Sequence, residues 1–229
     1  MGIYTGYQGS EANLASGSET EADSAKFGVY GTHGLGQGTW LTGAVGGGVH
    51  AYDTTRRVLG TDVEGDTDGR EISAQFGLGH DFQAGRWTFG PEAELAYTRL
   101  WIDGFTERGG LGPLEIQDQD ADSLRSTLGA RVSCDWVWEN TGWTLRPYAH
   151  AGWRHEFMHD NQAIGARFAG GSGSVFEVEG ASSARDSVVA GAGLGVAFDP
   201  RWTLQAGYAA EAAGDYEIHQ VNASVSFRF

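Results

Sequence analysis

The feature that most constrains the fold is a period-two alternation of apolar and polar residues that persists over long stretches. In residues 123–138, "SLRSTLGARVSCDWVW", Leu124 and Leu128 fall on one face of an extended chain, whereas Arg125 and Thr127 fall on the other. Alternation of this kind predicts β-strands, because successive side chains of a strand point to opposite faces. The runs of about 12–18 residues exceed the usual length of strands in soluble proteins, about 5–6 residues.

Ten such segments are predicted along the chain. They cover residues 2–9, 24–34, 38–52, 69–83, 85–102, 122–139, 142–158, 186–199, 201–213 and 216–229. The connections near 34–38, 83–85, 139–142 and 199–201 are tight, whereas those at 10–23, 53–68, 103–121 and 159–185 are long and carry glycine and acidic residues. Only the connection at 213–216 breaks this alternation of short and long.

Long alternating strands with short turns at one end and long loops at the other are typical of outer-membrane barrels. The sequence therefore predicts an all-β, antiparallel, up-and-down transmembrane barrel with an apolar lipid face and a polar lumen. Aromatic residues near strand ends fit the interfacial girdles of such barrels. The candidates are Trp40, Trp87, Trp101, Trp138, Trp143 and Trp202. A soluble β-sandwich or lipocalin-like barrel explains the alternation, but it explains neither the strand length nor the loop asymmetry.

Composition excludes several other classes. The formal net charge is −15 and Lys26 is the single lysine, so a nucleic-acid-binding surface is not expected. No run of 18 apolar residues could form a transmembrane helix, and the first ten residues do not read as a signal peptide. Cys134 is the single cysteine, which excludes an internal disulfide.

The segment His155–His159, "HEFMH", matches the H-E-x-x-H pattern of zinc proteases. That pattern holds one zinc only on a helix, yet residues 142–158 alternate as a strand. The two histidines would then lie about 13 Å apart, too far to share an ion that needs nitrogens at about 2.1 Å. The acidic run Asp118, Asp120 and Asp122 lacks the glycine and glutamate of a calcium loop. We expect no metal site and no cofactor.

Several motifs taken together resemble the translocator, or β-domain, of type V autotransporters. They run in order along most of the chain: "GVYGTH" (28–33), "GPEAELAYTRLWIDGFTERG" (90–109), "ADSLRSTLGARVS" (121–133), "LRPYAHAGWRHEF" (145–157), "FEVEGASSARDSVVAGAGLGV" (176–196) and the final "VNASVSFRF". The resemblance implies a twelve-strand barrel in the outer membrane of a Gram-negative bacterium, preceded by a pore-threading helix and a passenger.

The chain departs from that family pattern at its beginning, where "GIYTGYQGSEANLAS" resembles the third strand of the family's barrel. We therefore expect residues 1–229 to form one translocator domain that has about ten of the twelve strands and lacks the first strands, the linker helix and the passenger. An open strand edge is costly in lipid. We accordingly expect the first strand to pair with the last, with Ile3–Tyr7 against Val221–Phe227 as the weakest ladder.

The last strand carries a second expectation. Apolar residues alternate up to an aromatic end, which resembles the signal read by the outer-membrane assembly machinery through strand addition. The residues of this predicted assembly signal are Val221, Ala223, Val225, Phe227 and Phe229. A half-buried edge strand of ordinary kind would show the same alternation.

The polar faces of the predicted strands carry charges of both signs, which we expect to face the lumen. These candidates are Arg125, Arg131, Arg146, Arg154, Glu92, Glu94, Asp135, Glu156 and Glu211. Pairs of opposite charge on neighbouring strands would stabilise the sheet by about 0.2–1 kcal/mol each. The same side chains could instead contact a linker helix or passenger, and the sequence does not decide between the two.

The expected function is to anchor and export an N-terminal passenger, without catalysis by the barrel itself. The expected partners are outer-membrane lipid, the barrel-assembly machinery and the passenger. Two alternatives stay open. One is an omptin-type barrel protease, for which Asp103, His159, Asp160 and Asp186 could supply the chemistry. The other is a small adhesin or porin-like barrel with acidic loops.

Overall fold

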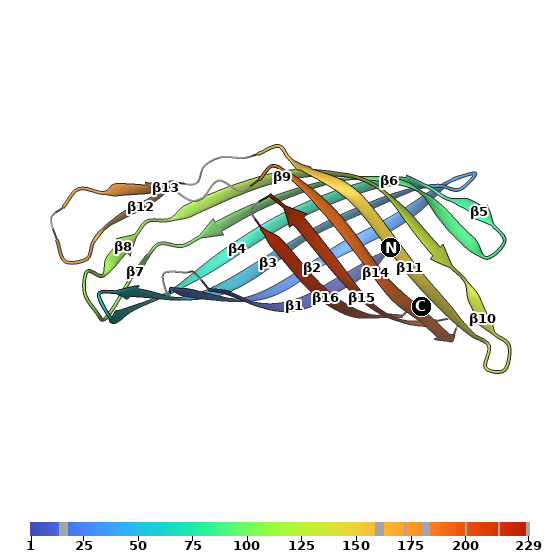
Figure 1. The fold of residues 1–229 in the computed structure, drawn as a ribbon, viewed down its shortest axis with the longest axis horizontal. Helices are drawn as coiled ribbons and strands as arrows, with labels where there is room; N and C mark the ends of the chain where they lie inside the picture. The colour runs from blue at the N-terminus through green and yellow to red at the C-terminus, as the bar shows by residue number, and fades with distance from the viewer. Residues whose placement is uncertain are drawn as a thin grey trace.

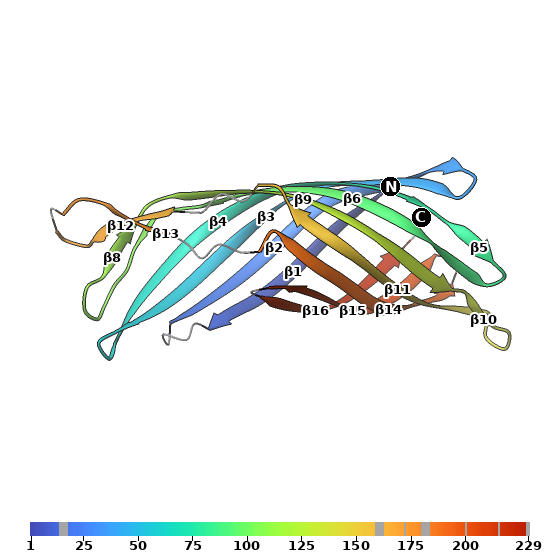
Figure 2. The same ribbon diagram turned by 45° about the horizontal axis from the view of Figure 1, so that its top comes forward.

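The computed structural model describes residues 1–13, 18–158, 163–171, 173–179, 184–199, 201–214 and 216–227. Antiparallel strands form one large curled sheet (Figures 1 and 2). Its ten long strands are β1 (Gly2–Asn13), β2 (Glu19–Gly36), β3 (Thr39–Val58), β4 (Thr61–His80), β6 (Trp87–Ile102), β9 (Gln119–Cys134), β11 (Trp143–Glu156), β14 (Asp186–Asp199), β15 (Trp202–Ala213) and β16 (Glu217–Phe227). We refer to these ten strands as the wall. The all-β, antiparallel, up-and-down fold predicted from the sequence is confirmed.

Each long strand pairs with its neighbour in chain order, from β1 at one end of the sheet to β16 at the other. Two short strands, β5 (Phe82–Ala84) and β10 (Trp136–Trp138), pair with β6 and β11 at the end where the connections are tight. That end lies at the right of Figure 1. Among the described residues, no helix is long and apolar enough to cross a membrane.

The predicted pairing of the first strand with the last is wrong for the described residues. β1 pairs with β2 and β16 pairs with β15, and no ladder joins β1 to β16. The side chains of β16 are exposed along the whole strand. β1 and β16 do not pair because the ten strands curl into a half-barrel, which leaves the two outer strands beyond hydrogen-bonding distance of each other.

The connections predicted as long loops at 10–23 and 53–68 are mostly strand. β3 and β4 pair continuously from Thr39 opposite His80 to Val58 opposite Thr61. The two residues between them, Leu59 and Gly60, have φ angles of 49° and 84°. Positive φ at both central positions is what a tight hairpin turn of type I′ requires. These hairpins run beyond the length that a bilayer demands, about 9–11 residues per strand.

The other two long connections carry a second, four-stranded sheet at the opposite end of the molecule from β5 and β10 (Figure 1). Its strands are β7 (Phe105–Thr106), β8 (Leu114–Ile116), β12 (Ala163–Phe168) and β13 (Phe176–Glu179). We call this sheet, with residues 103–118, the loop-side cap. It packs against the β3–β4 hairpin, where Val63 is fully buried and the backbones of Glu64 and Arg108 form an isolated antiparallel β-bridge. The sequence predicted loops here, and the strands are a correction.

Buried apolar residues are scarce in this fold. Among the described residues, Val63, Cys134 and Ala166 are the buried hydrophobic ones, whereas large apolar side chains such as Phe76, Leu128 and Trp153 are about half exposed, at 53 %, 53 % and 47 %. A soluble protein rarely exposes a contiguous apolar surface of this extent. The distribution is that of a protein whose apolar surface faces lipid.

Candidate functional site

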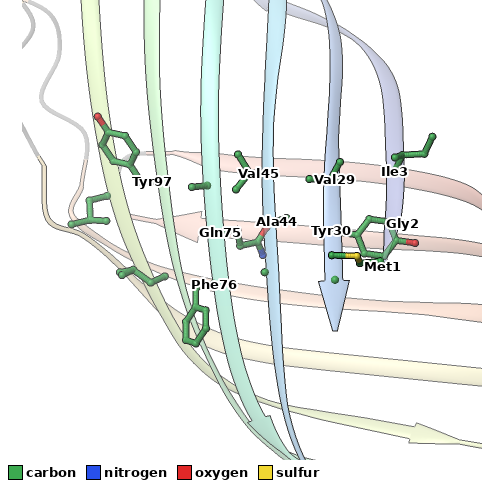
Figure 3. Close-up of a pocket in the computed structure, with 15 residues that line it drawn as sticks. Met1, Gly2, Ile3, Val29, Tyr30, Ala44, Val45, Gln75, Phe76 and Tyr97 are labelled. Carbon is green, nitrogen blue, oxygen red and sulfur yellow. The ribbon is translucent and has the colours of Figure 1, made fainter. Parts of the chain in front are cut away.

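The wall has two chemically different faces, set by the cross-strand register. On the first, Val29 stands opposite Val45, Val45 opposite Ala74, Ala74 opposite Tyr97, and Tyr97 opposite Leu124. Figure 3 shows Val29, Val45 and Tyr97 along one such row. We call this the apolar face. An apolar depression of about 750 Å³ lies on it between Val45 and Phe76.

The opposite, polar face carries the charged residues predicted from the sequence. Arg125 lies 3.6 Å from Glu156, and Arg146 pairs with Asp135. Arg154 pairs with Glu211 from β15. Arg125 and Arg154 therefore have acidic partners on a neighbouring and a next-nearest strand, and Arg146 has its partner between β9 and β10.

Glu211 is the centre of a larger network. Its carboxylate accepts hydrogen bonds from Ser187 at 2.7 Å and Tyr216 at 2.8 Å, in addition to Arg154. Glu156 similarly accepts from the hydroxyl of Ser123 and the backbone N–H of Leu124. Both carboxylates are largely enclosed, and their full sets of donors compensate for the loss of water.

Arg131 pairs with Asp81, a partner that the sequence did not predict. The guanidinium lies 2.7 Å from Asp81 and stacks over the ring of Trp40, with 4.2 Å to the ring centroid. Trp40 also donates to Asp81 at 3.3 Å. The assignment of Trp40 to an interfacial girdle is therefore wrong, because it stands opposite Gly79 on the polar face. Its large ring fits there because Gly79 has no side chain.

Glu92 and Glu94 differ from the other predicted charges. Neither forms an ion pair or a side-chain hydrogen bond with any residue that the structure describes. Glu94 stands between Gly77 and Thr127, and Glu92 between Gly79 and Gly129, so little side-chain bulk flanks them. They line a recess of about 270 Å³ together with Arg154 and Glu211.

A buried polar cluster on β2, β3 and β4 was not predicted. Ser24 lies 2.7 Å from Nδ1 of His50, and Nε2 of His50 lies 3.3 Å from Glu71. Lys26 closes the cluster with contacts of 2.9 and 3.1 Å to Glu71. The sequence contained one indication of this cluster, which is that Lys26 is the single lysine. The cluster itself could not be predicted, because its residues come from three strands and meet only through the register of those strands. Its direct contacts bind three neighbouring strands together.

Aromatic rings cover glycines elsewhere on the polar face. Tyr4 occupies the space that side chains at Gly28 and Gly46 would need, and Tyr148 does the same at Gly193 and Gly207. Glycine is required at these positions because a ring lies directly against the backbone.

The first two residues of the zinc-protease motif lie on a strand, as the alternation predicted. His155 and Glu156 end β11, and their side chains have different partners. Nδ1 of His155 is 2.8 Å from Asp186, whereas Glu156 contacts Ser123 on the other face. His159 lies outside the described residues.

Of the residues considered for an omptin-like site, Asp186 is held by His155 and Trp153, and Asp103 lies 3.8 Å from Arg70. Asp160 is also outside the described residues.

Two of the three aspartates of the acidic run share Arg99 as a partner, and the third contacts the backbone. Asp118 accepts from the backbone of Gly104, and Asp120 pairs with Arg99. Asp122 accepts a hydrogen bond from Tyr97 and lies 3.5 Å from Arg99.

Most of the predicted assembly signal lies in β16. Val221, Val225 and Phe227 are exposed at 82 %, 63 % and 47 % and share one face with Ala223. Phe227 packs on Trp202, with ring centroids 4.7 Å apart, beside the tight connection between β14 and β15. Phe229 lies outside the described residues.

The chain matches the family model of the autotransporter β-domain over residues 1–209. It therefore belongs to the autotransporter β-domain family. The translocator domain of NalP from Neisseria meningitidis has the same fold, with a TM-score of 0.74 and 20 % identity, over 99 % of this chain and 74 % of that one. The β-domain of BrkA from Bordetella gives a TM-score of 0.74 at 19 % identity, over 99 % and 82 % of the two chains.

Curated relatives are considerably longer. An extracellular serine protease of Serratia marcescens is 26 % identical over 236 residues, which cover all of this chain and 22 % of the relative. Esterase EstA of Pseudomonas aeruginosa is 27 % identical over 199 residues, which cover 83 % of this chain and 30 % of the relative. The chain thus spans less than a third of the length of these relatives, whose names refer to the whole proteins.

Proposed function

We propose that this β-domain anchors in the outer membrane of a Gram-negative bacterium and exports a passenger carried by the same polypeptide. The observation that carries the proposal is the family membership, combined with an apolar face that is exposed along the whole wall. The curated relatives contain the matched segment as a minor part of longer chains, which fits a barrel joined to a passenger. In this reading the barrel is not catalytic, and the protease and esterase names belong to other parts of those relatives.

The open edges of β1 and β16 support a further part of the proposal. Each unpaired backbone group in hydrocarbon costs several kcal/mol, so an open sheet is not stable in lipid. We infer that further strands of the whole protein cover these edges in the membrane. The structural relatives are matched over 74 % and 82 % of their own chains, which leaves length for such strands in those proteins.

The polar face would then line the pore. Arg125, Arg146 and Arg154 are neutralised by partners within the wall, so they are poorly suited to hold a passing chain. Glu92 and Glu94 are the predicted pore charges without such partners among the described residues. We propose that these two carboxylates contact cationic side chains of the segment that occupies the pore.

An epitope placed directly upstream of the β-domain in the full-length protein tests the export function. In intact cells, added protease should remove the epitope, and the β-domain should be found in the outer-membrane fraction. An epitope that stays protected while the β-domain is correctly inserted would contradict export.

The contribution of Glu92 and Glu94 can be tested in the same cells. Replacement of both by Gln should slow the appearance of the epitope at the surface without lowering the amount of inserted barrel. Glu139→Gln is the matched control, because Glu139 is an exposed carboxylate in the tight connection before β11. Equal export rates in the double variant and the control would reject this role.

The alternating apolar face of β16 is the proposed recognition element for the assembly machinery. Deletion of Phe229 from the full-length protein should lower the amount in the outer membrane and leave the periplasmic pool intact or raised. Phe227→Ala should have a separate effect, because Phe227 packs on Trp202 within the wall. Unchanged assembly after deletion of Phe229 would leave this residue without a signalling role.

A further inference from the structure

A second groove lies on the apolar face, nearer to the loop-side cap than the depression shown in Figure 3. Its volume is about 930 Å³, and it shares Val29 and Val45 with that depression. The floor is the run Gly46–Gly48 of β3, where no side chain projects. A Cβ atom added at Gly47 would lie 3.8 Å from the ring of Phe27, so a side chain there would fill the groove.

The walls of this groove are apolar and exposed. Phe27, Val49 and Ile72 are exposed at 62 %, 53 % and 50 %, and Trp101 closes one side at 37 %. The groove is within the size range of ligand sites, roughly 300–1,000 Å³. Because the apolar face meets lipid in the proposed function, the occupant of such a groove is a hydrocarbon chain.

One cation lies at the cap-side end of the groove. Arg70 stands between Val49 and Trp101 in the cross-strand register, so its side chain starts on the apolar face. Its side chain is 74 % exposed, and its one charged contact among the described residues is Asp103 at 3.8 Å, which is longer than a hydrogen bond. An arginine on a lipid-facing surface is costly unless its guanidinium reaches the headgroup layer.

The neighbouring arginine shows the contrast. Arg99 also starts on the apolar face, but it lies 3.1 Å from Asp120 and 3.5 Å from Asp122 and stacks on Trp101. Arg99 therefore donates a hydrogen bond to Asp120 and has a second carboxylate beside it, whereas the donors of Arg70 have no hydrogen-bond partner in the described part of the chain. A guanidinium with available donors binds a phosphate group through two parallel hydrogen bonds.

We propose that this groove binds one acyl chain of an anionic, phosphate-bearing membrane lipid, with Arg70 on the phosphate and the Gly46–Gly48 floor beneath the chain. The inference rests on the membrane placement in the proposed function. The 229 residues together carry a net charge of −15, which repels anionic lipids in general. A preference for an anionic lipid would therefore identify a local site.

The test uses the full-length protein reconstituted in phosphatidylcholine bilayers with traces of spin-labelled phosphatidic acid or phosphatidylcholine of identical acyl chains. Insertion is first verified by protection of the wall from protease, so that failed insertion, which would contradict the proposed function, is distinguished from failed lipid selection. The motionally restricted signal then gives the relative association of the two lipids. We expect a preference of about fivefold for phosphatidic acid, equivalent to roughly 1 kcal/mol.

Arg70→Gln should abolish the preference, and Val49→Phe should lower it by filling the groove. Arg108→Gln is the matched control, because Arg108 is 82 % exposed and lies 3.9 Å from Asp66, outside the groove. The control should keep the full preference. Equal association of both lipids with the unaltered protein, a preference that survives in Arg70→Gln, or an equal loss in Arg108→Gln would each overturn the proposal.

Discussion

The wall and the loop-side cap are both antiparallel sheets, but opposite kinds of residues stabilise them. In the wall, Phe76 and Leu128 are 53 % exposed, whereas in the cap the side chain of Glu107 is only 4 % exposed. The wall presents apolar side chains outward because its surroundings are hydrocarbon. The cap encloses a charge that is fully paired because its surroundings are water. The comparison shows that the exposed fraction of a side chain does not by itself identify the surface that functions in the membrane, because the surroundings of the wall and of the cap differ.

The largest expected effect comes from placing a charge on the apolar face of the wall. Leu128 stands opposite Ala93 and Trp153 on that face. Leu128→Arg should make the free energy of folding into the bilayer less favourable by about 2–4 kcal/mol if the residue lies near the membrane midplane, which should prevent stable insertion. Thr127→Arg should be milder, because Thr127 stands opposite Glu94 on the polar face. Folding titrations into bilayers would measure both, and equal effects would contradict the assignment of the two faces.

Loss of the buried carboxylate of the cap should have a smaller and local effect. Glu107 accepts hydrogen bonds from Arg56 at 2.9 and 2.6 Å and from the backbone of Leu114 at 2.8 Å. Glu107→Gln weakens charge-assisted bonds worth about 1.5–3 kcal/mol each. The cap should become sensitive to protease while the wall stays inserted. Loss of insertion in this variant would show that the cap and the wall do not form independently.

The ion pairs on the cap surface should make its stability depend on pH. Hydrogen bonds from Arg167 hold the pKa of Glu115 below its ordinary value. A lowered pKa means that the stabilisation is present above the carboxyl pKa of the unfolded chain, about 4.3, and is lost as the pH falls through the folded pKa. Hydrogen-exchange protection of β8 and β12 should therefore decrease below about pH 4.

Glu115→Gln provides the control for this pH dependence. At neutral pH the variant should already show the low hydrogen-exchange protection that the unaltered protein shows only in acid. Acidification should then change the protection of the variant little. A pH profile identical to that of the unaltered protein would assign the acid sensitivity to other groups.

The smallest expected effect concerns the zinc-protease motif. His155 is at the end of β11 and contacts Asp186, so His155→Ala should leave the metal content of the purified protein unchanged. Elemental analysis should find less than one zinc per chain in both proteins. One tightly bound zinc that disappears in the variant would contradict the strand assignment.

The sequence predicted the wall well and the cap poorly, for a physical reason. Within the membrane one face meets lipid and the other meets polar groups, so residues such as Leu124 to Trp138 must alternate. Beyond the membrane one face of the same hairpin packs against the cap, partly through paired charges such as Arg56 and Glu107, and the other meets water. Alternation of apolar and polar residues is therefore no longer required. Arg56 and Arg57 are adjacent in β3 for this reason, and the sequence reads there as a loop although the strand continues to Val58. The two- and three-residue strands β7 and β8 are too short to leave a pattern.

The charged residues show the same limit. Alternation identified which side chains share a face, including Arg154 and Glu211, which proved to be partners. It did not identify Asp81, which lies between two strands, as the partner of Arg131. It also missed Ser24, His50 and Glu71, because only the register of three strands brings them together.

The division of the wall into a lipid face and a pore face can be measured directly by cysteine scanning of the full-length protein. Cys134 is the single cysteine of these 229 residues, so Cys134→Ser, with every cysteine elsewhere in the full-length protein also replaced by Ser, gives a background for single cysteines at positions 123 to 130. In intact cells a membrane-impermeant maleimide should label the odd positions, which share the face of Arg125 and Thr127, more strongly than the even positions around Leu128. A lipid-soluble maleimide should show the reverse order. Labelling without a period of two, or with the two faces exchanged, would contradict the account.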